Sequence, residues 1–141
     1  MFLSVDFVPD EDHAYLYPIE FLNTLLPSGL PPHKLTLKIG APIMLLRNMN
    51  GARGQANGTQ LVIRGFGRHV LDAEIMTGPN VGERIFIPRI LLIASDSGLP
   101  FDLRRLQYPV RPAFAMTINK SQGQTLAHIG IYLPSPIFAH G

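Results

Sequence analysis

Residues 35–47 read LTLKIGAPIMLLR, and this stretch carries the two hydrophobic patterns that decide the fold. In its first half, apolar residues alternate with Thr36 and Lys38, which is the period-two pattern of a strand with one buried face. From Pro42 to Arg47 the apolar residues form a continuous run, which is typical of a strand buried on both faces. We therefore predict a strand-rich core that begins near residue 35.

The residues after this stretch repeat the same organisation of short strands and turns. Asn57-Gly58 is a strong turn signal, and the residues that follow it predict a strand over 59–64. Further turns and an interruption at Pro88 divide the sequence up to residue 94 into more strands of similar length. About five short strands with tight turns favour a small, strongly bent β-barrel of the SH3-like kind, which we predict over residues 35–94.

The residues before the predicted barrel, 1–34, are expected to hold three short elements. MFLSVDFV (1–8) alternates weakly and predicts a strand, and the acidic PDEDH (9–13) predicts a solvated linker. Pro18 suits the first position of a short helix whose apolar residues share one face as far as Leu26. This segment therefore predicts an N-terminal strand, an acidic linker and a short helix.

The last third of the chain, residues 95–141, has a different pattern. It predicts an apolar strand from Pro112 to Ile118, a short polar helix from Asn119 to Ala127, and a second, parallel strand at IGIYL (129–133). A strand–helix–strand unit builds α/β sheets, but a single unit does not cover both faces of its own sheet. The predicted fold class is therefore mixed β and α/β, with a small barrel beside an incomplete α/β segment.

The composition excludes several classes of protein. Hydrophobic residues make up 46% of the 141 residues and charged residues 16%, so a packed core is expected. There is no cysteine, which excludes disulfides and cysteine-bound zinc, and the five histidines have no short ligand spacing. No apolar run approaches the roughly 18 residues of a membrane span, and no signal peptide is recognisable. We expect a soluble, intracellular protein without a bound metal or a membrane partner.

Charge is distributed unevenly along the chain. The first 20 residues contain five acids and no Lys or Arg, whereas residues 21–141 hold 12 basic and five acidic residues, a balance of +7. A polyanion such as nucleic acid is therefore a candidate partner. Arg47 flanks a glycine-rich loop, and Arg104-Arg105 lies near Tyr108, a mixture of charge and aromatic surface found in single-strand binders. Solvated arginines at strand edges are the alternative, and the sequence leaves both open.

The segment AMTINKSQGQT (115–125) concentrates polar residues directly after a predicted buried strand. Polar side chains and free backbone N–H groups at this position lie at the carboxyl end of a sheet, where α/β folds bind anions. A helix N-terminus capped by Asn119 or Ser121 would use the same residue types. Both interpretations stay open on the residues alone.

Five ordered segments of the chain closely resemble the carboxyl-terminal half of the petite-integration-frequency (PIF-type) DNA helicases, especially the branch linked to Helitron transposons. The segments are LTLKIGAPIMLLRNMN, QANGTQLVI, FIPRI, FAMTINKSQGQTL and IYLPSPIFAHG. The resemblance runs from about Tyr17 to Gly141. It implies a superfamily 1B motor that uses ATP and Mg²⁺ to move 5′ to 3′ along single-stranded DNA, with roles in DNA repair and recombination.

The same resemblance implies a fold and a domain organisation. Members of the family have two RecA-like domains, with a small SH3-like domain, the 2B-type insert, placed inside the second. By this resemblance, residues 35–94 are the barrel insert, and residues 95–141 are a partial RecA-like segment that carries motif five. The partners it implies are single-stranded DNA and the RecA-like domain that the chain lacks.

The resemblance also implies roles for individual residues. Thr117, Asn119 and Lys120 would lie on the DNA side of motif five, and Gly123 and Gln124 on the nucleotide side. Many relatives have His where this chain has Asn119, so a hydrogen-bonding group is retained but a possible charge is lost. The resemblance assigns no catalytic residue to this chain, and Arg47 is added to the DNA-binding candidates because it is basic and flanks a loop.

Two departures from the family pattern bear on activity. The sequence contains no G-x-x-x-x-G-K-[ST] loop to cradle nucleotide phosphates and no acidic pair suited to Mg²⁺. The family's next block, which carries an arginine that stabilises transferred charge, is expected just after Gly141. We therefore expect a fragment that does not hydrolyse ATP alone and that is nuclear if the source is eukaryotic. The alternative is a stand-alone nucleic-acid or protein-interaction module built on the same barrel.

Overall fold

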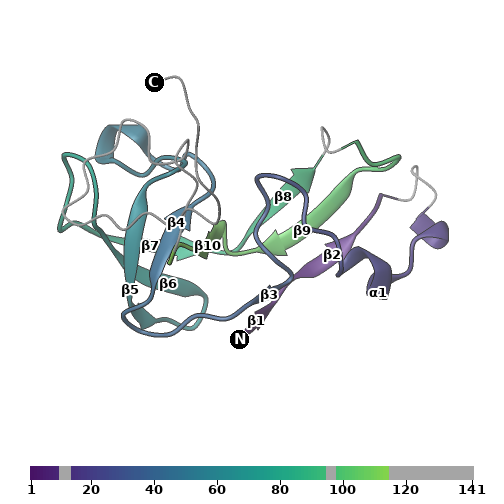
Figure 1. Cartoon of the computed structure of the whole chain (residues 1–141), viewed down its shortest axis with the longest axis horizontal. Helices are drawn as coiled ribbons and strands as arrows, with labels where there is room; N and C mark the ends of the chain where they lie inside the picture. The colour runs from purple at the N-terminus through teal and green to yellow at the C-terminus, as the bar shows by residue number, and fades with distance from the viewer. Residues whose placement is uncertain (10–13, 95–97, 115–141) are drawn as a thin grey trace, which may run out of the picture.

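The computed structural model describes residues 1–9, 14–94 and 98–114, which form mostly strands with little helix. Within them, the strands make a five-stranded sheet, a three-stranded sheet and a two-stranded ribbon. Figure 1 shows the two larger sheets side by side along the long axis of the molecule, with the two-stranded ribbon between them. The sheet-rich part of the predicted fold class is therefore confirmed.

The five-stranded sheet has the order β10-β4-β5-β6-β7, and every neighbouring pair is antiparallel. Its strands are β4 (Pro42–Leu45), β5 (Gln60–Phe66), β6 (Val70–Ile75), β7 (Arg84–Pro88) and β10 (Val110–Pro112). The strand predicted after Asn57-Gly58 is confirmed as β5, and Gly58 has a φ of +93°, which suits glycine in a turn. The interruption predicted at Pro88 is also confirmed, since β7 ends there.

Alternating side chains build the core of this sheet. Along β6 every second residue is buried, as the period-two pattern of VLDAEI requires. The fully buried residues of the cluster include Leu45, Ile63, Leu71 and Ile87. They make a single apolar face that holds the sheet together.

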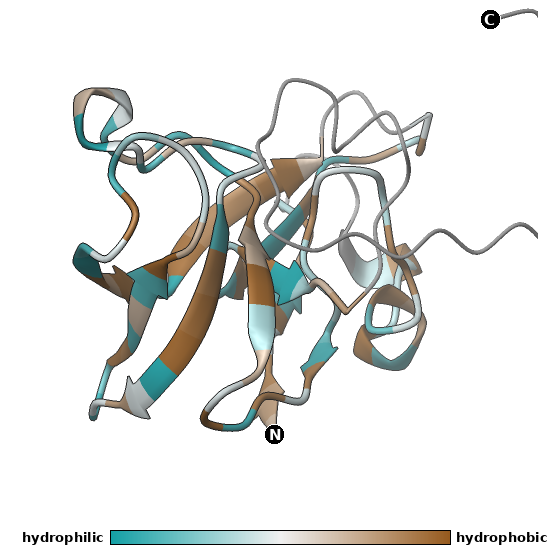
Figure 2. Ribbon diagram, turned by 60° about the vertical axis from the view of Figure 1, so that its left-hand side comes forward, coloured by the Kyte–Doolittle hydropathy of each residue, from teal (hydrophilic) through white to brown (hydrophobic). Residues whose placement is uncertain are grey.

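The three-stranded sheet has the order β2-β9-β8 and is also antiparallel. Its strands are β2 (Val5–Phe7), β8 (Ile90–Ala94) and β9 (Leu103–Gln107). One face packs Leu92 and Leu103 in a second core with Leu22 and Leu30. Figure 2 shows brown, hydrophobic segments in both sheets, so the molecule has two apolar centres.

The pairing of β8 differs from the prediction for residues 35–94. We expected ILLIA (90–94) to close the barrel, but it pairs with β9 in the other sheet, and β10 occupies the edge beside β4. Alternation of apolar residues identifies a strand but not its partner, which depends on where the chain crosses after Pro88. The assignment of this strand to the barrel was therefore wrong.

The predicted N-terminal strand is confirmed, although it is divided at Ser4. β1 (Phe2–Leu3) pairs with β3 (Lys34–Leu35), whereas β2 pairs with β9. Ser4 is buried between the two and its N–H donates to the carbonyl of His33 at 2.9 Å. The first seven residues therefore contribute to two sheets.

The helix before the first sheet is shorter than its apolar pattern predicts. α1 spans only Ile19–Leu22, and Pro18 is its N-cap rather than its first helical residue. The hydroxyl of Thr24 donates to the carbonyl of Phe21 at 2.7 Å, so a side chain competes for a backbone acceptor near the helix end. Single 3₁₀ turns lie at Ala14–Leu16 and Gly51–Arg53.

Only Pro112 of the strand predicted from Pro112 to Ile118 lies in a described strand, because β10 ends at that residue and Ala113 and Phe114 are outside any strand. β10 starts at Val110 and runs antiparallel to β4, and the N–H of Ala113 donates to the carbonyl of Pro42 at 3.0 Å. The predicted helix and second strand, in residues 115–141, lie outside the described residues. Within the described ranges, no helix is long and apolar enough to cross a membrane, and no three metal-binding side chains gather.

Candidate nucleic-acid interface

Motif five and its predicted site residues lie outside the part of the chain that the structure describes. They are Thr117, Asn119, Lys120, Gly123 and Gln124. Their roles on the DNA and nucleotide sides stay predictions. The described residues place other basic and aromatic side chains together.

Arg47, the remaining predicted DNA contact, follows β4 and is half-buried. Its Nη1 donates to the carbonyl oxygens of Gly29 at 2.7 Å and Leu46 at 2.8 Å. These bonds hold the loop around Gly29 against the end of β4 and fix the guanidinium in place. A DNA contact by Arg47 stays a prediction, with the remaining N–H groups as its donors.

Three arginines of the five-stranded sheet and its loops are neutralised by acids. The pairs are Arg53–Glu83 at 3.8 Å, Arg64–Glu74 at 3.2 Å and Arg84–Asp72 at 2.9 Å. The hydrogen bonds from Arg84 lower the pKa of Asp72, and those to Asp72 raise the pKa of Arg84. All three pairs are partly exposed, so each contributes little to the stability of the fold. Each pair also offsets one positive charge that would otherwise attract a polyanion.

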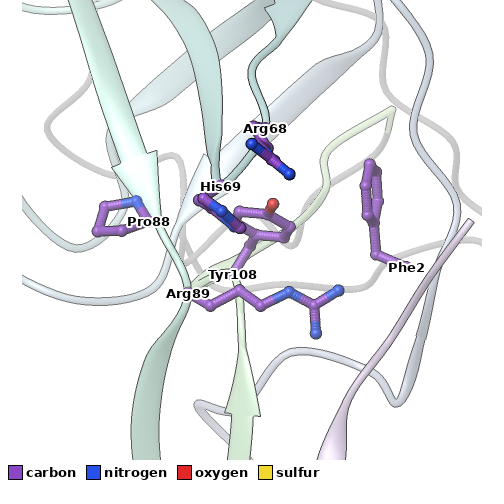
Figure 3. A pocket seen from close by; sticks show the side chains of 6 residues that line it. All are labelled: Phe2, Arg68, His69, Pro88, Arg89 and Tyr108. Carbon is purple, nitrogen blue, oxygen red and sulfur yellow. The ribbon is translucent and has the colours of Figure 1, made fainter.

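A cavity of about 450 Å³ lies where the two larger sheets meet. Its lining residues are basic, aromatic or proline: Phe2, Arg68, His69, Pro88, Arg89 and Tyr108. Figure 3 shows these side chains converging from the β5–β6 turn, the end of β7 and the residue after it, the link after β9, and β1. Among the described residues no acid lines the cavity, so none of them balances its positive charge.

Arg89 is held in place by two contacts. Its guanidinium carbon lies 5.1 Å from the centre of the Tyr108 ring, a cation–π distance, and its Nη1 donates to the carbonyl of Leu3 at 2.7 Å. Arg89 is the only residue between β7 and β8, so the crossing between the two sheets positions it. The charge is therefore oriented before any ligand arrives.

Two aromatic rings form the apolar side of the cavity. Phe2 and Tyr108 meet edge to face, with ring centres 5.3 Å apart, and Phe2 also lies 5.6 Å from Phe66. Tyr108 is only 3% exposed. The rings are packed into the core of the five-stranded sheet and give the cavity a rigid wall.

Arg105 and Tyr108 do not form the mixed charged and aromatic surface that their spacing in the sequence suggested. Arg105 is fully buried and Tyr108 nearly so, so neither offers an open surface to a single strand. The cation over the tyrosine ring is Arg89, which is 19 positions away and which spacing along the chain did not single out. Arg68 and His69 were likewise not predicted as candidate binding residues, because in the sequence they look like ordinary turn residues.

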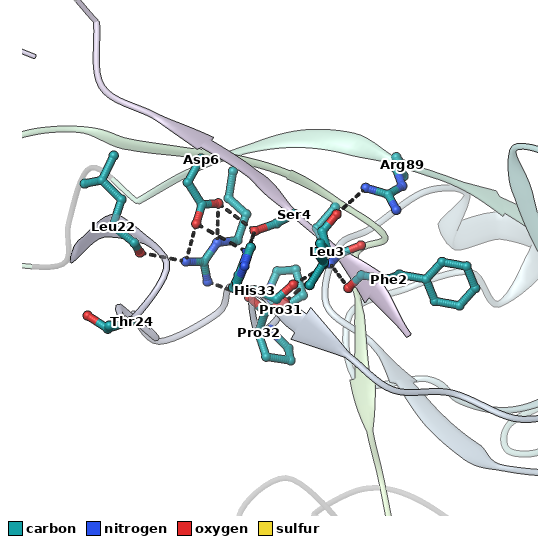
Figure 4. A network of polar contacts seen from close by, with 12 residues as sticks. Phe2, Leu3, Ser4, Asp6, Leu22, Thr24, Pro31, Pro32, His33 and Arg89 are labelled. Carbon is teal, nitrogen blue, oxygen red and sulfur yellow. Dashed lines mark hydrogen bonds and ion pairs between the residues drawn. The ribbon is translucent and has the colours of Figure 1, made fainter. Parts of the chain in front are cut away.

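Arg105 instead forms a buried ion pair with Asp6 (Figure 4). Its Nε donates to Asp6 Oδ1 at 2.7 Å and its Nη2 to Asp6 Oδ2 at 3.0 Å. The guanidinium also donates to the carbonyls of Pro31 at 3.0 Å and Leu22 at 3.1 Å. The pair therefore connects β2 and β9 to α1 and to the loop that follows it.

Neighbouring polar groups complete this network. Ser4 Oγ donates to Asp6 Oδ1 at 2.7 Å and lies 2.7 Å from His33 Nδ1. The side-chain amide of Gln107 donates to the carbonyls of Phe2 at 3.1 Å and His33 at 3.2 Å. These bonds hold β1 next to the end of β9, which keeps Phe2 and Tyr108 together at the cavity.

The sequence comparisons point to one group of proteins. Residues 20–66 match the family model described as DNA helicase Pif1, 2B domain. Human ATP-dependent DNA helicase PIF1 is 39% identical over 110 residues, which cover 76% of this chain and 16% of the human protein. ATP-dependent DNA helicase PIF6 of Trypanosoma brucei brucei is 28% identical over 116 residues, 76% of this chain and 14% of that protein. The chain thus spans less than a fifth of these relatives.

Solved structures give a similar result. The crystal structure of Pif1 helicase from Candida albicans has a TM-score of 0.59 at 21% identity, covering 89% of this chain and 31% of that one. The crystal structure of Bacteroides Pif1 bound to single-stranded DNA has a TM-score of 0.58 at 22% identity, covering 86% and 26%. At these identities the structures establish the fold alone. The chain is therefore similar in sequence to a region of Pif1-type DNA helicases that includes 2B-domain sequence, and similar in fold to their solved structures.

Proposed function

We propose that this chain is the part of a superfamily 1B, 5′ to 3′ DNA helicase that contains the 2B-type barrel insert and part of the second RecA-like domain. Its role would be to contribute contacts to single-stranded DNA and part of the ATP cleft. The observation that carries this proposal is the 2B-domain match over residues 20–66, together with 39% identity to a human ATP-dependent DNA helicase. A relative of the same fold has been solved bound to single-stranded DNA, which supports the choice of ligand.

The site residues of this proposal come from motif five and from the end of β4. Thr117, Asn119 and Lys120 would bind DNA phosphates together with Arg47, and contacts of this kind position the strand without reading its bases. The nucleotide-side residues, Gly123 and Gln124, would face ATP and its Mg²⁺ in the complete helicase. The first RecA-like domain of that helicase would be the protein partner.

The finer assignments are also proposals. Five ordered sequence blocks support the Helitron-associated branch of the family. A DNA substrate supports an intracellular location, nuclear in a eukaryote, and roles in DNA repair and recombination. An upstream phosphate-binding loop and a downstream arginine block in the flanking genomic sequence would support a helicase fragment. Start and stop signals directly around these codons would favour the stand-alone module.

The first prediction concerns catalysis by the 141-residue chain. Because the sequence has no loop to cradle the β and γ phosphates and no acidic pair for Mg²⁺, we expect no ATP hydrolysis above the buffer rate. The result should be the same with and without single-stranded DNA. Phosphate release from the purified chain is the measurement. Turnover that disappears on Lys120→Ala would contradict the prediction.

The second prediction concerns DNA affinity. With a balance of +7 in residues 21–141, the chain should bind single-stranded DNA with a dissociation constant on the order of micromolar or weaker. Because binding releases counterions, affinity should fall steeply as salt rises, and Lys120→Ala should lower it for every DNA sequence alike. Fluorescence anisotropy across a salt series measures this. An affinity that stays constant from low to high salt would show that phosphates are not the ligand.

A further inference from the structure

Four arginines in or next to the five-stranded sheet differ in their partners. Arg64 and Arg84 pair with acids on neighbouring strands, as described above. Arg68 and Arg89 line the cavity at the sheet junction, and among the described residues neither has an ion pair with an acid. Two arginine side chains without an acidic partner, next to apolar side chains, favour the binding of an anion.

We propose that this cavity is a subsite for one backbone phosphate of single-stranded DNA, bound by Arg68 and Arg89 with His69 beside them. The inference rests on the proposed function, since it takes DNA as the ligand, and it adds a site that motif five does not include. In Figure 3, Arg68 lies above the Tyr108 ring and Arg89 below it, with Phe2 across from both. Both arginines thus line the same cavity, with the Tyr108 ring between them in this view.

The geometry favours a phosphate rather than a stacked base. Phe2 and Tyr108 meet at an interplanar angle of 80° with centres 5.3 Å apart. Bases in DNA stack about 3.4 Å apart, so a base inserted between two rings would need them parallel and about 7 Å apart. The two rings therefore leave no space in which a base could stack between them. They form instead an apolar wall against which the guanidinium charge is less screened by water.

The donors available also fit a phosphate. Arg89 uses Nη1 for the Leu3 carbonyl, which leaves its other N–H groups as donors on a side chain already oriented by Tyr108. Guanidinium groups match phosphate oxygens by paired N–H bonds. A cavity of about 450 Å³ accommodates a phosphate with its sugar. Because Arg68 and Arg89 come from different links of the fold, a bound phosphate would also connect the β5–β6 turn to the sheet junction.

The test compares two variants with the same loss of charge. Arg68→Gln removes a cavity arginine, and Arg64→Gln removes an exposed arginine of the same strand region that is paired with Glu74. Binding of fluorescent oligothymidylate to the full 141-residue chain is measured by anisotropy over a salt series. We expect Arg68→Gln to weaken binding about fivefold and to reduce the salt slope by about 0.7, the value for one phosphate on a single strand. Arg64→Gln should change affinity by less than about twofold.

The outcomes separate the subsite from the proposed function. Equal losses in the two variants would mean a general charge effect and would overturn the subsite while DNA binding stands. No binding of oligothymidylate by the unaltered chain would overturn both. A loss in Arg68→Gln that varied strongly between oligothymidylate and oligodeoxyadenylate would indicate base recognition and would also overturn the phosphate assignment. Because both arginines are exposed, melting temperatures within a few degrees of the unaltered chain are expected for both variants.

Discussion

Replacing Asp6 by asparagine is expected to destabilise the folded chain by about 3–5 kcal/mol, the usual effect of removing one partner of a buried ion pair. Asp6 and Arg105 are both fully buried as side chains, and the carboxylate accepts two hydrogen bonds from the guanidinium, at 2.7 and 3.0 Å. Asparagine leaves the arginine charge without compensation in a dry site. Urea unfolding followed by circular dichroism measures the loss.

A matched control separates this effect from ordinary surface electrostatics. Glu74→Gln removes the acid of the partly exposed Arg64–Glu74 pair, and its cost should be below about 1 kcal/mol. A double variant, Asp6→Leu with Arg105→Met, should be less destabilised than Asp6→Asn, because apolar residues leave no unpaired buried charge. If Asp6→Asn and Glu74→Gln had similar small effects, the pair would not hold β2 to β9.

Ile63→Ala is expected to cost about 2–5 kcal/mol of stability, the range for truncating a large buried aliphatic side chain. Ile63 is 0% exposed in the centre of β5, within the core of the five-stranded sheet. The substitution removes apolar surface from the core and leaves a cavity that close-packed neighbours fill only in part. Thermal and urea unfolding of the purified chain measure the change.

Ile93→Ala is the control for this prediction, because it makes the same chemical change at a different depth. Ile93 lies in β8 and is 45% exposed, so its truncation should cost less than about 1 kcal/mol. A cost for Ile93→Ala equal to that of Ile63→Ala would show that the outer face of the three-stranded sheet is covered in solution. Such a result would contradict the exposed position of β8.

Local patterns predicted several strands because a strand has its own alternation, but residues 36–39, which alternate in the same way, are not in a strand, and β9 was not predicted. The residues of β5 and β6 carry the period-two pattern and bury alternate side chains as expected. Pro88 interrupts the run at the point where β7 ends and leaves one residue before β8. The relation to PIF-type helicases was also predictable, because it depends on ordered motifs that are read from the chain itself.

The candidate site was only partly predictable. The basic balance of residues 21–141 indicated a polyanion ligand, but not which arginines would be free to meet it. Arg64 and Arg68 lie four positions apart and look alike in sequence, yet only Arg64 has an acid across the strand pair. Arg64 lies in β5 within reach of Glu74 on β6, whereas Arg68 lies in the turn between these strands, outside both.

The sequence by itself determined several of the strands, such as β5 and β6, the excess of positive charge and the resemblance to a helicase region. The tertiary structure decided that β8 leaves the first sheet, that β10 takes its edge, and that Asp6 meets Arg105 across 99 positions of chain. It also decided that Phe2 and Arg89 share a cavity with Tyr108. The physical reason is that strand pairing and the burial of charged side chains depend on contacts between distant segments. The spacing of apolar residues along one segment does not show which distant segment it will contact.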